Sequence, residues 1–195
     1  MWVVRLRVKK RKTNQLRIIG GLLRGSKIDF PDEVGLRPTT DRIRETLFNW
    51  VMNRIEGSRS LDLYAGSGSL GIEALSRGAS EVVFIEENKN TARVLADNIA
   101  RLNITGSKII STTALSYLKS VTPNPFDLVF IDPPYALKEQ QQVLEILVSH
   151  QWVHQQSRIY VEMLKDEDIQ LPDSWCWLKR KVAGGVSFGI VAQQE

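Results

Sequence analysis

The chain has little of the chemistry that defines several common protein classes. Its single cysteine, Cys176, cannot form an intrachain disulfide, and its only two histidines are His150 and His154. A disulfide scaffold and a structural zinc site need clusters of these residues, so both are excluded, and we expect no metal. No apolar run approaches the roughly 20 residues that span a bilayer, so we expect no membrane segment.

The remaining composition is that of one soluble globular domain. The chain has 195 residues, of which 43% are hydrophobic and 25% are charged. This length and apolar content can form a sizeable core without a second domain. The sequence contains no internal repeat and no linker that would separate two domains.

Positive charge is concentrated at the N-terminal end. Residues 1–44 contain 12 Lys and Arg against 4 Asp and Glu, whereas the other 151 residues contain 14 against 18. The densest run, Lys9 to Lys12, would attract polyanions by neutralising phosphates, although a solvated tail has the same composition. The first residues lack the long apolar core of a secretory signal. We therefore expect a cytoplasmic protein with a nucleic-acid partner.

The apolar pattern predicts an α/β fold. Residues 15–30 form two short apolar segments broken by glycines, which is typical of a β-hairpin. A helix capped by Thr39 or Thr40 should follow. Strand-like and helix-like segments then alternate, which favours a mainly parallel sheet flanked by helices. We expect strands at 59–64, 81–86, 108–111, 126–131 and 158–163, and helices at 69–77, 88–101, 113–120 and 138–149.

The C-terminal end predicts a second hairpin. Residues 175–182 and 186–192 are separated by Ala183-Gly184-Gly185 and should pair as antiparallel strands. The main sheet then has seven strands. We expect residues 1–36 to form a basic tail and hairpin extension and residues 37–195 to form the main domain.

A glycine-rich loop follows the first strand of the main domain, in the segment Asp62-Leu-Tyr-Ala-Gly-Ser-Gly-Ser-Leu-Gly71. Gly66, Gly68 and Gly71 have the spacing G-x-G-x-x-G, in which the backbone turns sharply and approaches a ligand closely. Glu86, with Glu87 beside it, ends the second strand, where an acid can bind a ribose diol. These features fit any adenosine cofactor and do not separate a nicotinamide from S-adenosylmethionine.

Asp62 favours S-adenosylmethionine. A carboxylate just inside the end of the strand would attract the ammonium of a methionine group and repel a pyrophosphate. The alternative is that Asp62 only holds the amides of the loop.

The segment Asp132-Pro133-Pro134-Tyr135 carries the strongest chemical signal. The two prolines make the turn rigid and leave carbonyls as acceptors, Asp132 adds a carboxylate, and Tyr135 adds an aromatic face. Such a pocket suits the exocyclic amine of a nucleobase flipped from its stack or presented by a loop. Asp132 and the Pro133 carbonyl would orient the amine, and Asp132 would finally accept its proton. The alternative is a turn with a surface tyrosine.

These motifs together resemble those of class I S-adenosylmethionine-dependent methyltransferases. Segments 17–25, 37–50 and 73–78 further resemble the bacterial RsmD family, and the similarity runs from about residue 17 to residue 192. Enzymes of that family methylate the N2 amine of a guanine in 16S ribosomal RNA of the small subunit.

The resemblance implies a Rossmann-like seven-stranded sheet with an antiparallel last strand, and S-adenosylmethionine as methyl donor. It also implies three groups of site residues. The catalytic group is Asp132, Pro133, Pro134 and Tyr135; the cofactor-binding group is Asp62, Tyr64, Gly66, Ser67, Gly68, Glu86, Glu87, Thr113 and Ala114; the RNA-binding group is Arg17, Arg24, Arg37, Arg42 and Arg44. Ion pairing with Asp41 or Glu45 is the alternative for the arginines, and Thr113 stands where many methyltransferases have an acid.

Other functions remain open at this point. An adenine-N6 methyltransferase acting on DNA or RNA uses the same tetrapeptide, a nicotinamide dehydrogenase uses a similar glycine loop, and a noncatalytic RNA-binding assembly factor could keep the fold. For the methyltransferase we expect a monomer that acts on 16S rRNA within a small ribosomal subunit or an assembly intermediate.

Overall fold

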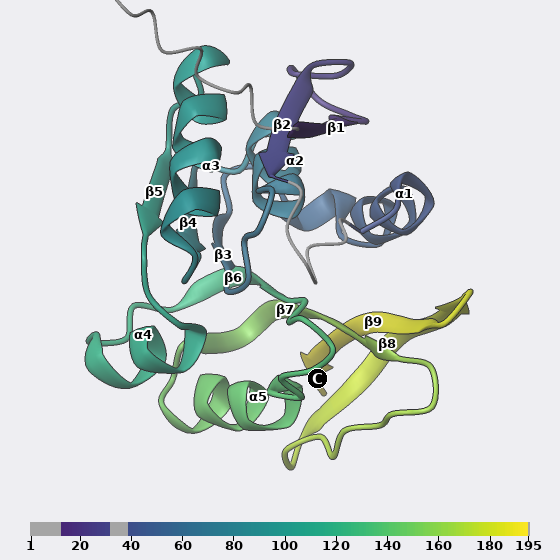
Figure 1. Ribbon diagram of the computed structural model, residues 1–195. Coiled ribbons are helices and arrows are strands. Elements are labelled where there is room, and N and C mark those ends of the chain that lie inside the picture. Colours follow the sequence, from purple (N-terminus) through teal and green to yellow (C-terminus); the bar gives the residue numbers. More distant parts are fainter. Residues whose placement is uncertain (1–12, 32–38, 195) are drawn as a thin grey trace, which may run out of the picture.

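The computed structural model describes residues 13–31 and 39–194 of the chain. The basic run Lys9 to Lys12, Arg37 and the expected domain boundary after residue 36 lie outside the described residues. Two sheets are present in the described part, a two-stranded one and a seven-stranded one (Figure 1). Across residues 13–31 and 39–194, no helix combines the length and apolar character that crossing a membrane requires.

The seven-stranded sheet has the order β5-β4-β3-β6-β7-β9-β8. Strands β3 to β7 are parallel, and β9 is antiparallel to both of its neighbours, β7 and β8. The expected antiparallel last strand is therefore confirmed, and β8 rather than β9 occupies the edge of the sheet. The strands are β3 (Arg59–Asp62), β4 (Glu81–Ile85), β5 (Ser107–Ile110), β6 (Phe126–Ile131), β7 (Val153–Leu164), β8 (Trp175–Ala183) and β9 (Val186–Gln193).

Helices cover both faces of this sheet (Figure 1). Helices α4 (Ala114–Ser120) and α5 (Gln140–Ser149) pack on one face, and α1 (Asp41–Trp50), α2 (Ser69–Ser76) and α3 (Lys89–Arg101) pack on the other. A short 3₁₀ helix, η1 (Met52–Arg54), follows α1. Alternate side chains of a strand point to opposite faces, so β6 needs apolar residues at nearly every position. Leu128 and Phe130 accordingly face α1, whereas Val129 and Ile131 face α4 and α5.

The N-terminal hairpin consists of β1 (Thr13–Arg17) and β2 (Lys27–Pro31) and packs on the α2 and α3 side. Its connecting loop presses against the end of α2, where the Leu22 amide donates to the Ser76 carbonyl at 2.7 Å. Gly21 has φ +74°, and a Cβ at this position would overlap the Ser76 carbonyl. Glycine is therefore required for the hairpin to dock on α2.

Several local predictions differ from the structure: the strand expected at 59–64 ends at Asp62, and the helix expected at 138–149 begins at Gln140. Strand β7 begins at Val153, before the expected residue 158, because the register shifts and Ser157 donates its hydroxyl to the Phe126 carbonyl. The polar residues 154–156 in this stretch hid the start of the strand. Thr40 occupies the N-cap position of α1 but makes no side-chain capping hydrogen bond.

Candidate active site

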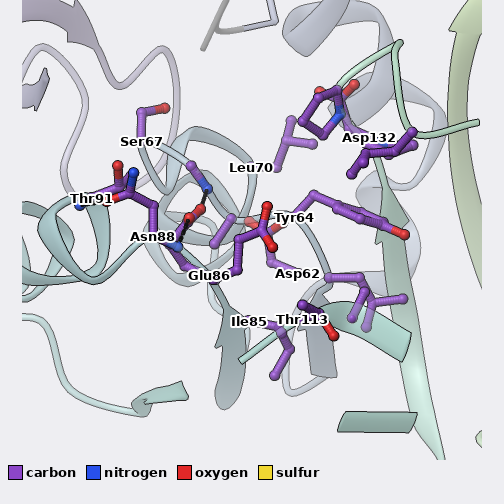
Figure 2. Close-up of a pocket in the computed structure, with 18 of the residues that line it drawn as sticks. Asp62, Tyr64, Ser67, Leu70, Ile85, Glu86, Asn88, Thr91, Thr113 and Asp132 are labelled. Atoms are coloured by element: carbon purple, nitrogen blue, oxygen red, sulfur yellow. Dashed lines mark hydrogen bonds between the residues drawn. The ribbon is translucent and has the colours of Figure 1, made fainter. Parts of the chain in front are cut away.

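A cavity of about 280 Å³ lies at the carboxyl ends of β3, β4 and β6. Carboxyl ends of parallel strands meet at one edge of a sheet, which is where α/β folds bind ligands. The cavity is lined by all expected catalytic and cofactor-binding residues except Gly68. Figure 2 shows that the labelled side chains come from the ends of several strands and the starts of the helices that follow them.

Each of the three glycines of the loop is required for a different structural reason. Gly66 has φ +51° and lies against the cavity. Gly68 has φ +79°, and a Cβ there would overlap Leu95 of α3. A Cβ on Gly71 would overlap the ring of Phe84. Gly66 thus leaves room for a ligand, whereas Gly68 and Gly71 allow α2 to pack closely.

Two carboxylates hold the loop by accepting backbone N–H bonds. Glu86 accepts from Gly66 through Oε2 and from Asn88 through Oε1, both at 2.8 Å (Figure 2). Asp62 Oδ2 accepts from the Gly71 amide at 3.1 Å. Asp62 therefore supports the segment after the loop and also lines the cavity, so holding backbone amides is not its only possible role.

Burial gives Asp62 an unusual protonation equilibrium. The pKa of Asp62 is raised to about 7, mainly by burial and also by the negative charge of Glu86, while the hydrogen bond from the Gly71 N–H acts in the opposite direction. An opposite charge beside a buried carboxyl favours its ionised form. A ligand ammonium at this position would therefore be attracted to Asp62 and would favour its deprotonation.

The far side of the cavity is formed by α4 and by Tyr64. Thr113 is the N-cap of α4: its Oγ1 accepts from the Ser116 amide at 3.1 Å and donates to Ser116 Oγ at 2.8 Å. One lone pair of Thr113 Oγ1 then remains for a ligand amine. The Tyr64 hydroxyl donates to Glu139 Oε2 at 2.7 Å, which fixes its ring in the cavity wall. Burial and the Glu139 carboxylate raise the pKa of Tyr64.

Asp132 receives a hydrogen bond from a distant part of the chain. Thr39 Oγ1, just before α1, donates to Asp132 Oδ2 at 2.8 Å. Burial raises the pKa of Asp132 well above its usual value, and the negative charge of Glu162 raises it further. The Thr39 hydrogen bond acts in the opposite direction because it stabilises the carboxylate.

Glu162 of β7 supports the catalytic segment through a hydrogen bond from Tyr135. Its side chain is buried, with the residue only 4% exposed. Tyr135 donates its hydroxyl to Oε1 at 3.1 Å, and Tyr160 donates to Oε2 at 2.6 Å. Burial raises the pKa of Glu162, and these two hydrogen bonds oppose the effect. Glu162 thereby orients the ring of Tyr135 at the edge of the cavity.

Three residues of this arrangement were not predicted from the sequence. The sequence predicts Thr39 only as a helix cap and Glu139 only as part of a helix. Glu162 had a detectable signal, because it is an acid within the otherwise apolar stretch 159–163. Buried acids need partners, so an acid in such a strand indicates a local polar network.

The expected RNA-binding arginines separate into two groups. Arg17, Arg24 and Arg42 are exposed. Arg44 is fully buried: its Nη2 donates to the Arg17 carbonyl at 2.7 Å and to Asp41 Oδ1 at 2.6 Å, and its Nη1 lies 3.7 Å from Glu73 Oε2. We therefore remove Arg44 from the expected RNA contacts, because its charge is used inside the fold.

A seven-stranded sheet of this order with a cavity at the ends of β3, β4 and β6 defines a Rossmann-like methyltransferase. A family model described as conserved hypothetical protein 95 matches residues 16–192. The ribosomal RNA small subunit methyltransferase D of Haemophilus influenzae is 43% identical over 179 residues, which cover 90% of this chain and 93% of the relative. The Escherichia coli protein of the same name is 38% identical over 183 residues, covering 93% and 92%.

Comparison with solved structures agrees with the similarity found in sequence. A solved Escherichia coli structure superposes with a TM-score of 0.86 at 36% identity, covering 93% of this chain and 99% of that chain. The chain belongs to the ribosomal RNA small subunit methyltransferase D family, which confirms the resemblance seen in the sequence.

Proposed function

We propose that this protein transfers a methyl group from S-adenosylmethionine to the exocyclic N2 of a guanine in 16S ribosomal RNA. The observation that carries the proposal is the position of Asp132 to Tyr135 in the same cavity as the glycine loop and Glu86. A base amine and a methyl donor can therefore meet in one site. The names of the relatives, which are small-subunit ribosomal RNA methyltransferases, support ribosomal RNA as the substrate.

The residues present fit the methyl donor. Asp62 suits its ammonium, Glu86 suits its ribose diol with Glu87 beside it, and Thr113 offers an acceptor to the adenine amine. Ile85 and Leu70 add apolar walls, and Ser67 and Ala114 also line the cavity. When bound, S-adenosylmethionine supplies a methyl group on a positively charged sulfonium, which is already a good leaving group.

The Asp132 segment prepares the base amine for attack. This amine is a weak nucleophile because its lone pair is delocalised into the ring. Hydrogen bonds from its two N–H groups to Asp132 and to the Pro133 carbonyl favour a more tetrahedral nitrogen and direct the lone pair toward the methyl carbon. Tyr135 offers a ring on which the base can stack, and Pro134 stiffens the turn. Correct positioning can supply much of the rate acceleration.

Asp132 also receives the proton that the amine loses. Burial and the charge of Glu162 raise the pKa of Asp132, which makes its carboxylate a stronger base. Because Thr39 donates to Oδ2, we assign Oδ1 as the acceptor for the amine. The ionised carboxylate is therefore the active form.

The exposed arginines Arg17, Arg24 and Arg42 would contact RNA phosphates together with Arg37. We further propose that the protein acts in the cytoplasm as a monomer, and that its substrate is rRNA within a small ribosomal subunit or an assembly intermediate.

The decisive experiment identifies the methylated base. Purified protein and isotopically labelled S-adenosylmethionine are incubated with small ribosomal subunits that lack native base methylation, and the digested RNA is analysed by mass spectrometry. We expect labelled N2-methylguanosine. Labelled N6-methyladenosine would overturn the choice of base, and no label in rRNA or in control DNA would favour a noncatalytic binding factor.

A further inference from the structure

We propose that the exposed edge strand β8 is a second RNA-binding surface. In this surface, Lys179 and Lys181 contact phosphates of the RNA segment that carries the target base. None of the arginines considered above lies on this strand. The inference rests on the proposed function because it takes RNA as the substrate.

The pairing of the strands places both lysines level with the catalytic segment. Across the sheet, Phe130 of β6 pairs with Tyr160, Tyr160 with Ile190, and Ile190 with Lys179. Two residues further along β7, Glu162 pairs with Phe188, and Phe188 pairs with Lys181. Asp132 directly follows Ile131, which pairs with Val161, so continuing the register by one residue brings Asp132 level with Glu162. Lys181 therefore lies three strand spacings, or about 14 Å, from the strand that delivers Asp132.

A register shift decides which side chains of β8 point toward α1. Opposite residues of an antiparallel pair point to the same face. The shift lies between Trp177 and Lys179, so Lys179 and Lys181 share the face of Ile190 and Phe188, which α1 covers. Arg180 points to the other face, where it pairs with Asp168 at 2.9 Å.

Helix α1 connects this surface to the catalytic carboxylate. At the N-terminal end of the helix, Thr39 bonds Asp132. At the other end, Trp50 stacks on Phe188 with ring centroids 5.5 Å apart, and Lys181 Nζ lies 5.7 Å from the Trp50 ring. Ten helical residues span about 15 Å, which matches the three strand spacings. The cation–π contact keeps Lys181 on the α1 side.

The charge of the hairpin complements a polyanion. Residues 174–194 contain Lys179, Arg180 and Lys181 and no acid. Lys179 and Lys181 are exposed, and so is Arg42 on α1. Figure 1 shows α1 and the tip of the β8–β9 hairpin on the same side of the molecule. An RNA strand that delivers a base to Asp132 can therefore run along α1 and over β8.

The test removes the two charges and compares the result with a matched control. The variant is Lys179→Gln with Lys181→Gln, and the control is Lys108→Gln with Lys119→Gln. Lys108 is exposed on β5 at the opposite edge of the sheet, and Lys119 is exposed at the end of α4 on the opposite face. Both variants lose the same charge. Binding to unmethylated small subunits and to deproteinised 16S rRNA is measured over a series of salt concentrations.

We expect the β8 variant to bind both RNAs on the order of tenfold more weakly at about 0.1 M salt. The slope of log K against log salt should fall by about one per lysine. The control should match the unmodified protein, and the melting temperature and kcat at saturating RNA should be unchanged in both variants.

Three results would overturn the proposal. In the first, the β8 variant binds RNA as well as the control does. In the second, the β8 variant binds particles more weakly but binds deproteinised rRNA normally, which would show that β8 contacts a ribosomal protein. In the third, β8 pairs with a second copy, seen as a dimer that the variant loses while RNA affinity is unchanged.

Failure of this inference can be told apart from failure of the proposed reaction. If the β8 variant loses RNA affinity but no preparation methylates rRNA, the surface stands and the reaction is wrong. If rRNA is methylated and the β8 variant behaves like the control, the reaction stands and the surface is wrong.

Discussion

Thr39 donates a hydrogen bond of 2.8 Å to Asp132 Oδ2, although the two residues are 93 positions apart in the chain. This contact ties the segment that leads into α1 to the carboxylate that we place at the reacting amine. It occupies one carboxylate oxygen, and it stabilises the ionised form against the effects of burial and of Glu162. Thr39 is therefore a positioning residue for the proposed reaction.

Thr39→Val should move the pH dependence of the reaction. Because the variant loses a donor to the carboxylate, the pKa of Asp132 rises, and activity that requires ionised Asp132 is lost at higher pH than before. A hydrogen bond to a charged group contributes about 1.5–3 kcal/mol, so the acid limb of the kcat profile should move up by about one pH unit or more. Thr39→Ser keeps the donor and should restore the original profile; a Ser variant that behaves like Val would contradict this role.

Asp132→Asn should abolish most of the chemistry without unfolding the protein. An amide cannot accept the proton, so we expect kcat to fall by about 10²–10⁴-fold. Removing a buried carboxylate should not lower the melting temperature, because desolvation already disfavours its charge. Rapid-mixing kinetics give kcat, and calorimetry with S-adenosylhomocysteine should show unchanged affinity. A variant that retains full activity would remove Asp132 from the mechanism.

Binding of the methyl donor should depend on the protonation of Asp62. Its pKa of about 7 means that free Asp62 is largely protonated at about pH 6, and an ammonium at this site requires the ionised form. Affinity for S-adenosylhomocysteine should therefore fall by up to about tenfold per pH unit below the pKa, with proton release on binding. Calorimetry in buffers of different ionisation enthalpy measures both effects. Asp62→Asn should bind weakly with no such pH dependence, and an unchanged dependence would place the titrating group elsewhere.

Arg44 and Arg42 should affect different properties. Arg44→Ala leaves buried Glu73 without one of its cations, so we expect the free energy of unfolding to fall by about 3–5 kcal/mol. Arg42→Ala at the exposed position should change stability by no more than about 0.5 kcal/mol. If Arg42 contacts a phosphate, its loss should weaken RNA binding and lower the salt slope by about one. Denaturant unfolding and RNA titrations of both variants check this, and a stable Arg44→Ala protein would contradict the buried role.

The assembled particle should be a better substrate than free rRNA. A protein of 195 residues offers little surface for selecting one guanine, so a particle that presents the base in a defined shape should raise kcat/KM. The comparison uses unmethylated small subunits and deproteinised 16S rRNA under identical salt. Equal or faster methylation of the free RNA would show that the RNA sequence and fold suffice.

Much of the fold was predictable because its signals are local. The expected strand 126–131 agrees with β6, and the expected helices at 69–77 and 88–101 differ from α2 and α3 by one residue at one end. Alternation of apolar residues and glycine punctuation act over a few positions, so they are readable in sequence. The start of β7 was missed because polar residues lie between Val153, which pairs with Phe126, and Arg158, which pairs with Leu128.

The candidate site divides in the same way. The tetrapeptide at Asp132, the glycine loop and Glu86 are recognisable because each sits directly after a strand, and parallel strands bring their carboxyl ends to one edge. Exposure cannot be read from residue type, so Arg44 resembled the exposed arginines.

The sequence by itself determined the order of the elements, the concentration of positive charge and the chemistry available at the ends of the strands. Only the tertiary structure decided that Thr39 bonds Asp132, that Glu162 holds Tyr135, and that Lys181 lies level with Asp132 on the α1 side. The physical reason is that these contacts join residues far apart in the chain. They depend on strand order, register and burial, which no local window of sequence contains.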